Sequence, residues 1–128
     1  MLPDDTAKKI LIIDDEQPLR EILCNTLEKE GFTCVQAVNG KEGLSLAFQE
    51  RPDVILLDVA MPVMDGIEML KKLRQDAWGK QAKIIILTNF SGTQRVFEEF
   101  GIQESDYVVK ASWKLEDIIK KIRGKLKS

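Results

Sequence analysis

The chain has 128 residues, a formal net charge of −2 and 44% hydrophobic residues, values that are typical of a single soluble domain. It contains no histidine, which excludes Ser-His-Asp triads, HExxH zinc sites and an internal phosphohistidine. No apolar run approaches the roughly 18 residues of a membrane span, and the amino terminus lacks a signal-peptide pattern. We therefore expect a cytoplasmic protein without membrane insertion, forming one domain over residues 1–128 with an extended or disordered segment at about residues 1–7.

Apolar segments of strand length alternate with segments of helical periodicity along the chain. The predicted strands are 10–13, 34–38, 54–57, 84–87 and 107–109. The apolar stripes that predict the intervening helices are Leu19, Ile22, Leu23 and Leu27, then Leu44, Ala47 and Phe48, then Ile67, Leu70 and Leu73, then Val96, Phe97 and Phe100, and last Leu115, Ile118, Ile119, Ile122 and Leu126. This alternation predicts an α/β protein with a five-stranded parallel sheet, a doubly wound, flavodoxin-like (βα)5 fold with strand order 2-1-3-4-5.

Acidic residues stand at the ends of two predicted central strands. Asp14 and Asp15 follow the first strand and Asp58 follows the third, so all three should meet where the strand order reverses. Carboxylates brought together repel one another unless a cation neutralises them. Because the donors are all oxygens, the sequence predicts a Mg²⁺ site, with Mn²⁺ as the alternative.

Two further strand ends carry groups that suit a phosphoryl ligand. Thr88 follows the fourth strand and Lys110 follows the fifth. A hydroxyl and an ammonium at adjacent strand ends can bind two phosphoryl oxygens while a metal holds the third. Either residue alone has an ordinary structural explanation as a cap or a solvated strand end.

These motifs together resemble the receiver domains of two-component response regulators. The resemblance rests on "IDDE" after the first strand, "LLDVAMPVMDG" around the third, Thr88 and Lys110. It implies that Asp58 is the phosphate acceptor and that Thr88 and Lys110 contact the phosphoryl oxygens. It also implies a metal site made of Asp14, Asp15, Asp58 and the backbone carbonyl of Ala60, and a switch made of Thr88 and Tyr107.

The resemblance further implies a signalling module without a diffusible substrate. Its expected partners are a sensor histidine kinase or phosphotransfer protein and a downstream protein target, bound through the face of the fourth helix, fifth strand and fifth helix. We expect no direct nucleic-acid binding, and a monomer or a phosphorylation-dependent dimer. The chain is then not an enzyme beyond its own phosphorylation and dephosphorylation. The alternatives are a pseudo-receiver scaffold and a Mg²⁺-dependent aspartyl phosphatase or phosphotransferase, but a phosphatase of the haloacid dehalogenase type needs an acid where Ala60 stands.

Two positions depart from the receiver pattern. Receivers usually carry proline after the conserved lysine, in a cis peptide, whereas here Ala111 follows Lys110. Because a cis bond before a non-proline residue costs about 2.5–4 kcal/mol, we predict a trans bond. Asn89 and Phe90 follow Thr88, and we expect the bulk of Phe90 to slow hydrolysis of the phosphoaspartate.

The remaining features have structural interpretations. Cys24 and Cys34 show no CxxC spacing and are predicted to be buried free thiols. The lysine-rich stretch 120–127 could form a nucleic-acid patch, but its lysines avoid the isoleucine stripe, which favours the polar face of an amphipathic helix.

Overall fold

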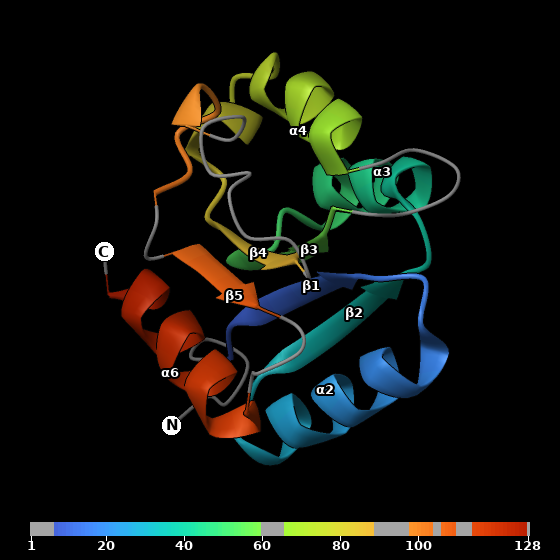
Figure 1. The fold of residues 1–128 in the computed structure, drawn as a ribbon, viewed down its shortest axis with the longest axis vertical. Coiled ribbons are helices and arrows are strands. Elements are labelled where there is room, and N and C mark those ends of the chain that lie inside the picture. Colours follow the sequence, from blue (N-terminus) through green and yellow to red (C-terminus); the bar gives the residue numbers. More distant parts are fainter. Residues whose placement is uncertain (1–6, 60–65, 89–97, 104–105, 110–113, 128) are drawn as a thin grey trace.

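The structure of the chain is a computed structural model (Figure 1), which describes residues 7–59, 66–88, 98–103, 106–109 and 114–127. Ala60, Phe90, Lys110 and Ala111 lie outside these ranges. The predictions that concern them, including the trans Lys110–Ala111 bond, therefore stay predictions. Of the expected amino-terminal segment, only Ala7 is described.

Five parallel strands form one sheet in the order β2-β1-β3-β4-β5, as the alternation of elements predicts. The strands are β1 (Lys9–Ile13), β2 (Thr33–Ala37), β3 (Val54–Asp58), β4 (Ile84–Thr88) and β5 (Tyr107–Val109). No strand end differs from its predicted position by more than one residue. The central strands β3 and β4 are buried along their whole length, whereas the edge strand β2 is only partly buried. Continuous apolar runs thus mark the strands that helices cover on both faces.

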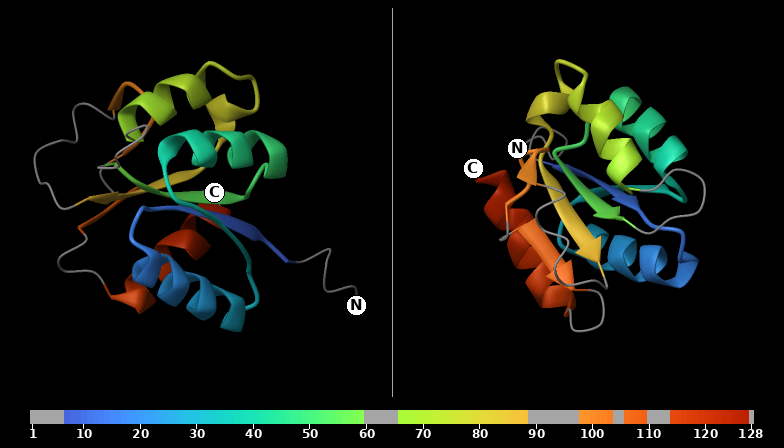
Figure 2. Two further views of the ribbon diagram at one scale, coloured as in Figure 1. Left: turned by 90° about the vertical axis from the view of Figure 1, so that its right-hand side faces the viewer. Right: turned by 45° about the horizontal axis from the view of Figure 1, so that its top comes forward.

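Helices lie on both faces of the sheet (Figure 2). The described helices are α2 (Gln17–Lys29), α3 (Gly40–Glu50), α4 (Gly66–Arg74), the 3₁₀ turn η1 (Gly79–Gln81) and α6 (Leu115–Leu126). One face carries α3 and α4, and the other carries α2 and α6. Of the stripe Val96, Phe97 and Phe100 that predicts the fourth helix, only Phe100 lies within the described residues.

The core has two layers, one on each face of the sheet. Leu11 and Ile13 of β1 belong to the cluster under α3 and α4, and Ile10 and Ile12 belong to the cluster under α2 and α6. Successive strand residues point to opposite faces, so every buried strand contributes to both layers. Packing on both faces holds the sheet in place, so the residues at its strand ends have well-defined positions.

Two residues assigned to apolar helical stripes lie at the surface instead. Ile22 is 49% exposed and Phe48 is 39% exposed. Each neighbours a buried residue of the same helix, Leu23 or Ala47, and consecutive residues are rotated by about 100° around a helix. The buried stripes are therefore narrower than the sequence pattern predicts.

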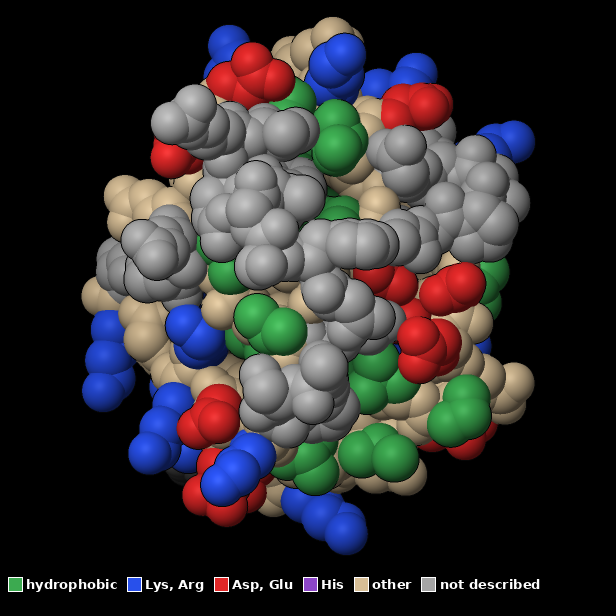
Figure 3. Space-filling model, in the orientation of Figure 1, with side chains coloured by type: hydrophobic (Ala, Val, Ile, Leu, Met, Phe, Trp, Pro, Cys, Tyr) green, Lys and Arg blue, Asp and Glu red, His purple; other side chains and the backbone are tan. Residues whose placement is uncertain are grey.

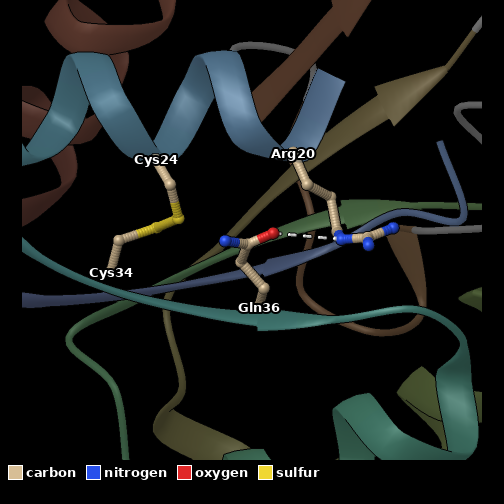
Figure 4. The surroundings of a disulfide bond; sticks show 4 residues. All are labelled: Arg20, Cys24, Cys34 and Gln36. Atoms are coloured by element: carbon tan, nitrogen blue, oxygen red, sulfur yellow. Dashed lines mark hydrogen bonds between the residues drawn. A yellow bond between two sulfur atoms is a disulfide. The ribbon is translucent and has the colours of Figure 1, made fainter. Parts of the chain in front are cut away.

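The cysteine prediction is wrong. Cys24 and Cys34 form a disulfide between α2 and β2, and their Cα atoms are 5.6 Å apart (Figure 4). Cys24 lies on the buried face of α2, and Cys34 packs against the same core layer. Their Cα separation is within the range that a disulfide spans. Sequence spacing could not predict the pairing because the two residues meet only through packing of the helix on the edge strand.

The carboxyl-terminal helix agrees with its predicted amphipathic character. Ile118 and Ile122 of α6 are buried, whereas Lys120 is exposed. Lys125 forms an ion pair with Asp106, with 2.6 Å between Nζ and Oδ1. None of the helices in the described ranges is long and apolar enough to cross a membrane.

Candidate acidic site at the carboxyl ends of the strands

Two acids predicted to meet lie at the ends of neighbouring parallel strands. Asp58 is the last residue of β3, and Asp14 directly follows β1. Ile13 pairs with Leu57 in the sheet, so Asp14 and Asp58 occupy the next position on strands about 4.8 Å apart. Both are almost completely buried, with relative exposures of 0% and 3%. The sheet register thus brings these two acids together at one edge.

The tightest group of carboxylates differs from the predicted one. Oxygens of Asp14, Asp15 and Glu16 all lie within 4.8 Å of one another, and Asp58 is not in this group. Acidic side chains gather near the start of α2 on the face shown in Figure 3. Glu16 was missed as a candidate, although it is the last letter of the "IDDE" motif. Its backbone N–H donates to Oδ1 of Asp14 at 2.9 Å, which fixes the turn that carries all three acids.

This group has the chemistry and the size of a divalent-cation site. Mg²⁺ binds oxygen ligands at about 2.0–2.1 Å, so ligands on opposite sides of the ion are about 4.2 Å apart. The 4.8 Å limit on the observed oxygens is close to that span, and small side-chain rotations would close the difference. Asp15 and Glu16 are exposed, so an ion can reach them from solvent. The residues present therefore fit a hard divalent cation.

Both backbone polar groups of Asp14, its N–H and its carbonyl oxygen, form hydrogen bonds to neighbouring elements. Its N–H donates to the carbonyl oxygen of Ala37 at the end of β2, at 3.1 Å. Its carbonyl oxygen accepts a hydrogen bond from Nη1 of Arg20 in α2 at 2.8 Å. Arg20 is 8% exposed, and its Nε also donates to Oε1 of Gln36 in β2 at 3.2 Å. Sequence reasoning missed Arg20, because an arginine one turn into a helix usually extends into solvent.

Thr88 and Tyr107 lie on the neighbouring strands. Thr88 is the buried last residue of β4, and Tyr107 is the half-buried first residue of β5. Tyr107 pairs with Ile86, which precedes Thr88 by two positions and therefore shares its face. The two side chains thus project toward the same layer of the protein, under α3 and α4. Their switch role stays a prediction.

The hydroxyl of Tyr107 stays protonated at neutral pH. Burial raises the pKa of this phenol, and the nearby carboxylates of Glu98 and Asp106 raise the pKa further. A phenolate would add a third negative charge beside those two carboxylates. The side chain of Tyr107 is therefore uncharged at neutral pH.

Comparison with known protein families agrees with this geometry. Residues 10–123 match the family model of the response regulator receiver domain. The chain belongs to this family. The receiver domains are components of two-component systems, and the resemblance found in the motifs is confirmed.

Curated proteins similar to this receiver domain include both short and long chains. Sporulation initiation phosphotransferase F of Bacillus subtilis is 38% identical over 91 residues, which cover 71% of this chain and 72% of that protein. The probable transcriptional regulator ycf27 of Guillardia theta is 38% identical over 106 residues, which cover 83% of this chain but 41% of that protein. The DNA-binding regulator RpaA of Synechocystis is 32% identical over 119 residues, covering 93% and 49%. This receiver domain thus spans less than half of the two longer relatives.

Solved receiver structures share the fold over nearly the whole chain. The chemotaxis response regulator CheY4 of Vibrio cholerae has a TM-score of 0.85 and 31% identity, covering 94% of this chain and 100% of that chain. The response regulator TrrA of Thermotoga maritima, in complex with Mg²⁺–BeF, has a TM-score of 0.79 and 35% identity, covering 93% and 99%. The predicted flavodoxin-like receiver fold is therefore confirmed.

Proposed function

We propose that this receiver domain accepts a phosphoryl group on Asp58, in a Mg²⁺-dependent reaction, from a phosphohistidine of a sensor histidine kinase or phosphotransfer protein. The observation that carries the proposal is the burial of Asp58 at the end of β3, one strand away from the acidic group that begins at Asp14. Similarity to a phosphotransferase of sporulation supports a phosphotransfer role. Similarity to a receiver complexed with Mg²⁺–BeF supports the choice of metal.

The acceptor step assigns a role to Asp58. One carboxylate oxygen attacks phosphorus, the bond from phosphorus to the donor nitrogen breaks, and the donor imidazole retains the nitrogen electron pair. The chain has no histidine, so the donor must be another molecule. Because Asp58 ends a buried strand, its carboxylate is held in one place and approached only from the carboxyl edge of the sheet. The reaction is a self-modification rather than turnover of a substrate.

The acids of the turn after β1 would hold the cation whose charge the reaction requires. When bound there, Mg²⁺ supplies positive charge that offsets the negative charge on the transferred phosphoryl group. Asp14 and Asp15 would hold the ion, and Glu16 lies close enough to take part directly or through water. Asp58 and the carbonyl of Ala60 stay predicted ligands, and Mn²⁺ remains an alternative ion.

The output of the reaction is a change of charge at one edge of the sheet. A phosphoryl group adds about −1.5 to −2 charge and new acceptor oxygens at Asp58. Thr88 and Lys110 are the proposed ligands of those oxygens, and movement of Thr88 would release space for Tyr107 on the same face. We infer that a downstream protein target reads this change on the face that includes β5 and α6.

Acetyl phosphate tests the proposal without the natural donor. Incubation with Mg²⁺ and acetyl phosphate should add one phosphoryl group, about 80 Da by intact mass, as a base-labile modification of the type that adds phosphate charge. Asp58→Asn should abolish the adduct. Asp53→Asn is the matched control, because Asp53 lies just before the same strand at its opposite end, where it accepts a hydrogen bond from the N–H of Lys9 at 2.7 Å.

The outcomes separate this function from its alternatives. A wild-type adduct that persists in Asp58→Asn would show that another residue is the acceptor. Absence of both an adduct and metal binding would favour a pseudo-receiver scaffold. Steady hydrolysis of an added phosphoester would favour an aspartyl phosphatase.

A further inference from the structure

The acidic turn is connected to a disulfide through a short series of contacts. Arg20 in α2 donates to the carbonyl oxygen of Asp14 at 2.8 Å and to Gln36 of β2 at 3.2 Å. It therefore bridges the helix, the edge strand and the turn that carries the acids. A displacement of Arg20 would release the Asp14 carbonyl and change the direction of the acids.

The Cys24–Cys34 disulfide lies alongside this bridge (Figure 4). Cys24 is four residues after Arg20, so both side chains lie on the same face of α2. Cys34 is two residues before Gln36, so both project from the same face of β2. The covalent bond between α2 and β2 and the hydrogen bond between them thus hold the same two surfaces together, one helical turn apart.

The edge position of β2 makes this bond important for the local structure. In the five-stranded sheet, β2 is an edge strand that pairs with β1 alone, and α2 packs against it. The disulfide joins α2 to β2 and closes a loop between residues 10 positions apart in sequence. Without it, α2 and β2 can separate at a lower free-energy cost, because local openings are controlled by local contacts.

We propose that the Cys24–Cys34 pair is a redox control on the divalent-cation site and that Arg20 is the positioning residue that transmits it. Two thiols of a dithiol reductant would reduce the bond. The S–S bond breaks, both cysteines become thiols, and the reductant becomes a disulfide, with two electrons and two protons transferred. In the reduced protein Arg20 is held less firmly, and the acids bind the cation more weakly. Structural disulfides are rare in the cytoplasm expected for this chain, which favours a redox-responsive pair. The inference rests on the cation site of the proposed function.

The first experiment compares the affinity for Mn²⁺ in the two redox states. Wild-type protein is oxidised with glutathione disulfide or reduced with dithiothreitol, the reagent is removed under nitrogen, and free Mn²⁺ is followed by electron paramagnetic resonance. We expect reduction to raise the Kd by about fivefold, a typical coupling between two sites. Cys24→Ala/Cys34→Ala should show the weaker affinity under both conditions. The double alanine variant suits the apolar surroundings of Cys24.

The outcomes distinguish this inference from the proposed function. Failure of oxidised wild type to bind Mn²⁺ would overturn the cation site itself. Equal affinities in the two redox states would overturn only the redox control. Mass tagging of thiols in the denatured protein must show none after oxidation and two after reduction, and persistent thiols after oxidation would also overturn it.

The second experiment tests Arg20 as the transmitting residue. Arg20→Met should raise the Kd for Mn²⁺ by about 10-fold, as loss of an outer-shell partner typically does, and should remove the difference between redox states. Arg20→Lys should restore part of the affinity because it can still donate to the Asp14 carbonyl. Arg74→Met is the matched control, since Arg74 also donates to backbone carbonyls but near the amino end of β4. If Arg20→Met binds Mn²⁺ as tightly as oxidised wild type, Arg20 has no positioning role, and if folded Arg74→Met loses as much affinity as Arg20→Met, the loss is not specific to Arg20.

Discussion

The two ends of the parallel sheet treat charge in opposite ways. At the amino ends of the strands, opposite charges pair: Lys9 with Glu50 at 2.8 Å, and Lys125 with Asp106 at 2.6 Å. At the carboxyl ends, carboxylates of the same sign gather within 4.8 Å of one another. The two ends of the sheet thus differ, because ion pairs stabilise the amino ends, whereas the carboxyl ends hold an acidic group that suits a cation.

This difference shows where stability and function are located. Charges and hydrogen-bond donors at the amino ends have partners that the folded chain supplies. The acids at the carboxyl ends gain from a cation that comes from outside, because like charges in one place favour its binding. Variants at the amino ends should therefore change stability without changing the site, and variants at the carboxyl ends should change the response to metal.

The largest effect is expected from Arg74→Met. Arg74 donates to the carbonyl oxygens of Phe100, Gly79 and Ala82 at 2.6–2.9 Å. Its burial lowers the pKa of the guanidinium, but arginine remains charged at neutral pH. Since hydrogen bonds from charged groups contribute about 1.5–3 kcal/mol each, and the losses are not additive, we expect a loss of about 3 kcal/mol. Urea unfolding measures it, and a loss below 1 kcal/mol would show that water replaces these contacts.

Magnesium should stabilise the wild-type protein through the carboxyl ends alone. At about 100 times its Kd, a ligand that binds only the folded state stabilises it by about 2.7 kcal/mol. Asp15→Asn should abolish this gain, because Asp15 belongs to the acidic group. It should also raise the stability of the metal-free protein slightly by removing one like charge. Thermal unfolding with Mg²⁺ and with chelator checks both expectations, and equal gains in the two proteins would contradict them.

Asp106→Asn should have a smaller effect at the amino ends. The carboxylate of Asp106 accepts a hydrogen bond from the N–H of Gln103 at 2.9 Å and pairs with Lys125 at 2.6 Å. Asparagine retains an acceptor for Gln103 but loses the ion pair, so we expect a loss of about 1 kcal/mol. The yield of adduct with acetyl phosphate should stay at the wild-type level. A change in that yield would mean that the two ends of the sheet are coupled.

The smallest expected effect is the alkaline titration of Tyr107. Its pKa is raised in the folded protein, chiefly by burial, so the folded chain holds this proton more tightly than the unfolded chain. The resulting stability is complete below the ordinary pKa of about 10 and is lost as the pH rises through the higher folded value. Tyr107→Phe removes this titration. The stability of wild type relative to Tyr107→Phe should fall as the pH rises above about 10 in urea unfolding, and a constant difference would contradict it.

The sequence predicted the frame of the protein and most of the residues at the carboxyl edge. Continuous apolar runs located β3 and β4, and the alternation with helices predicted the strand order. The proximity of Asp14 and Asp58 could be predicted because the carboxyl ends of parallel strands lie at the same edge of the sheet, however the core packs. These conclusions depend on local sequence patterns and on the rules that govern how strands and helices are connected, and both can be applied to the sequence alone.

The contacts that pass between elements were decided by the tertiary structure. Cys24 and Cys34 looked like separate buried thiols, and no sequence pattern singled out Arg20. Packing of α2 on the edge strand β2 made the first pair a disulfide and turned Arg20 toward the Asp14 carbonyl. Sequence periodicity gives the face of a helix but neither its rotation nor its distance from a strand. Those two quantities depend on how the whole core packs, and they determine which side chains touch.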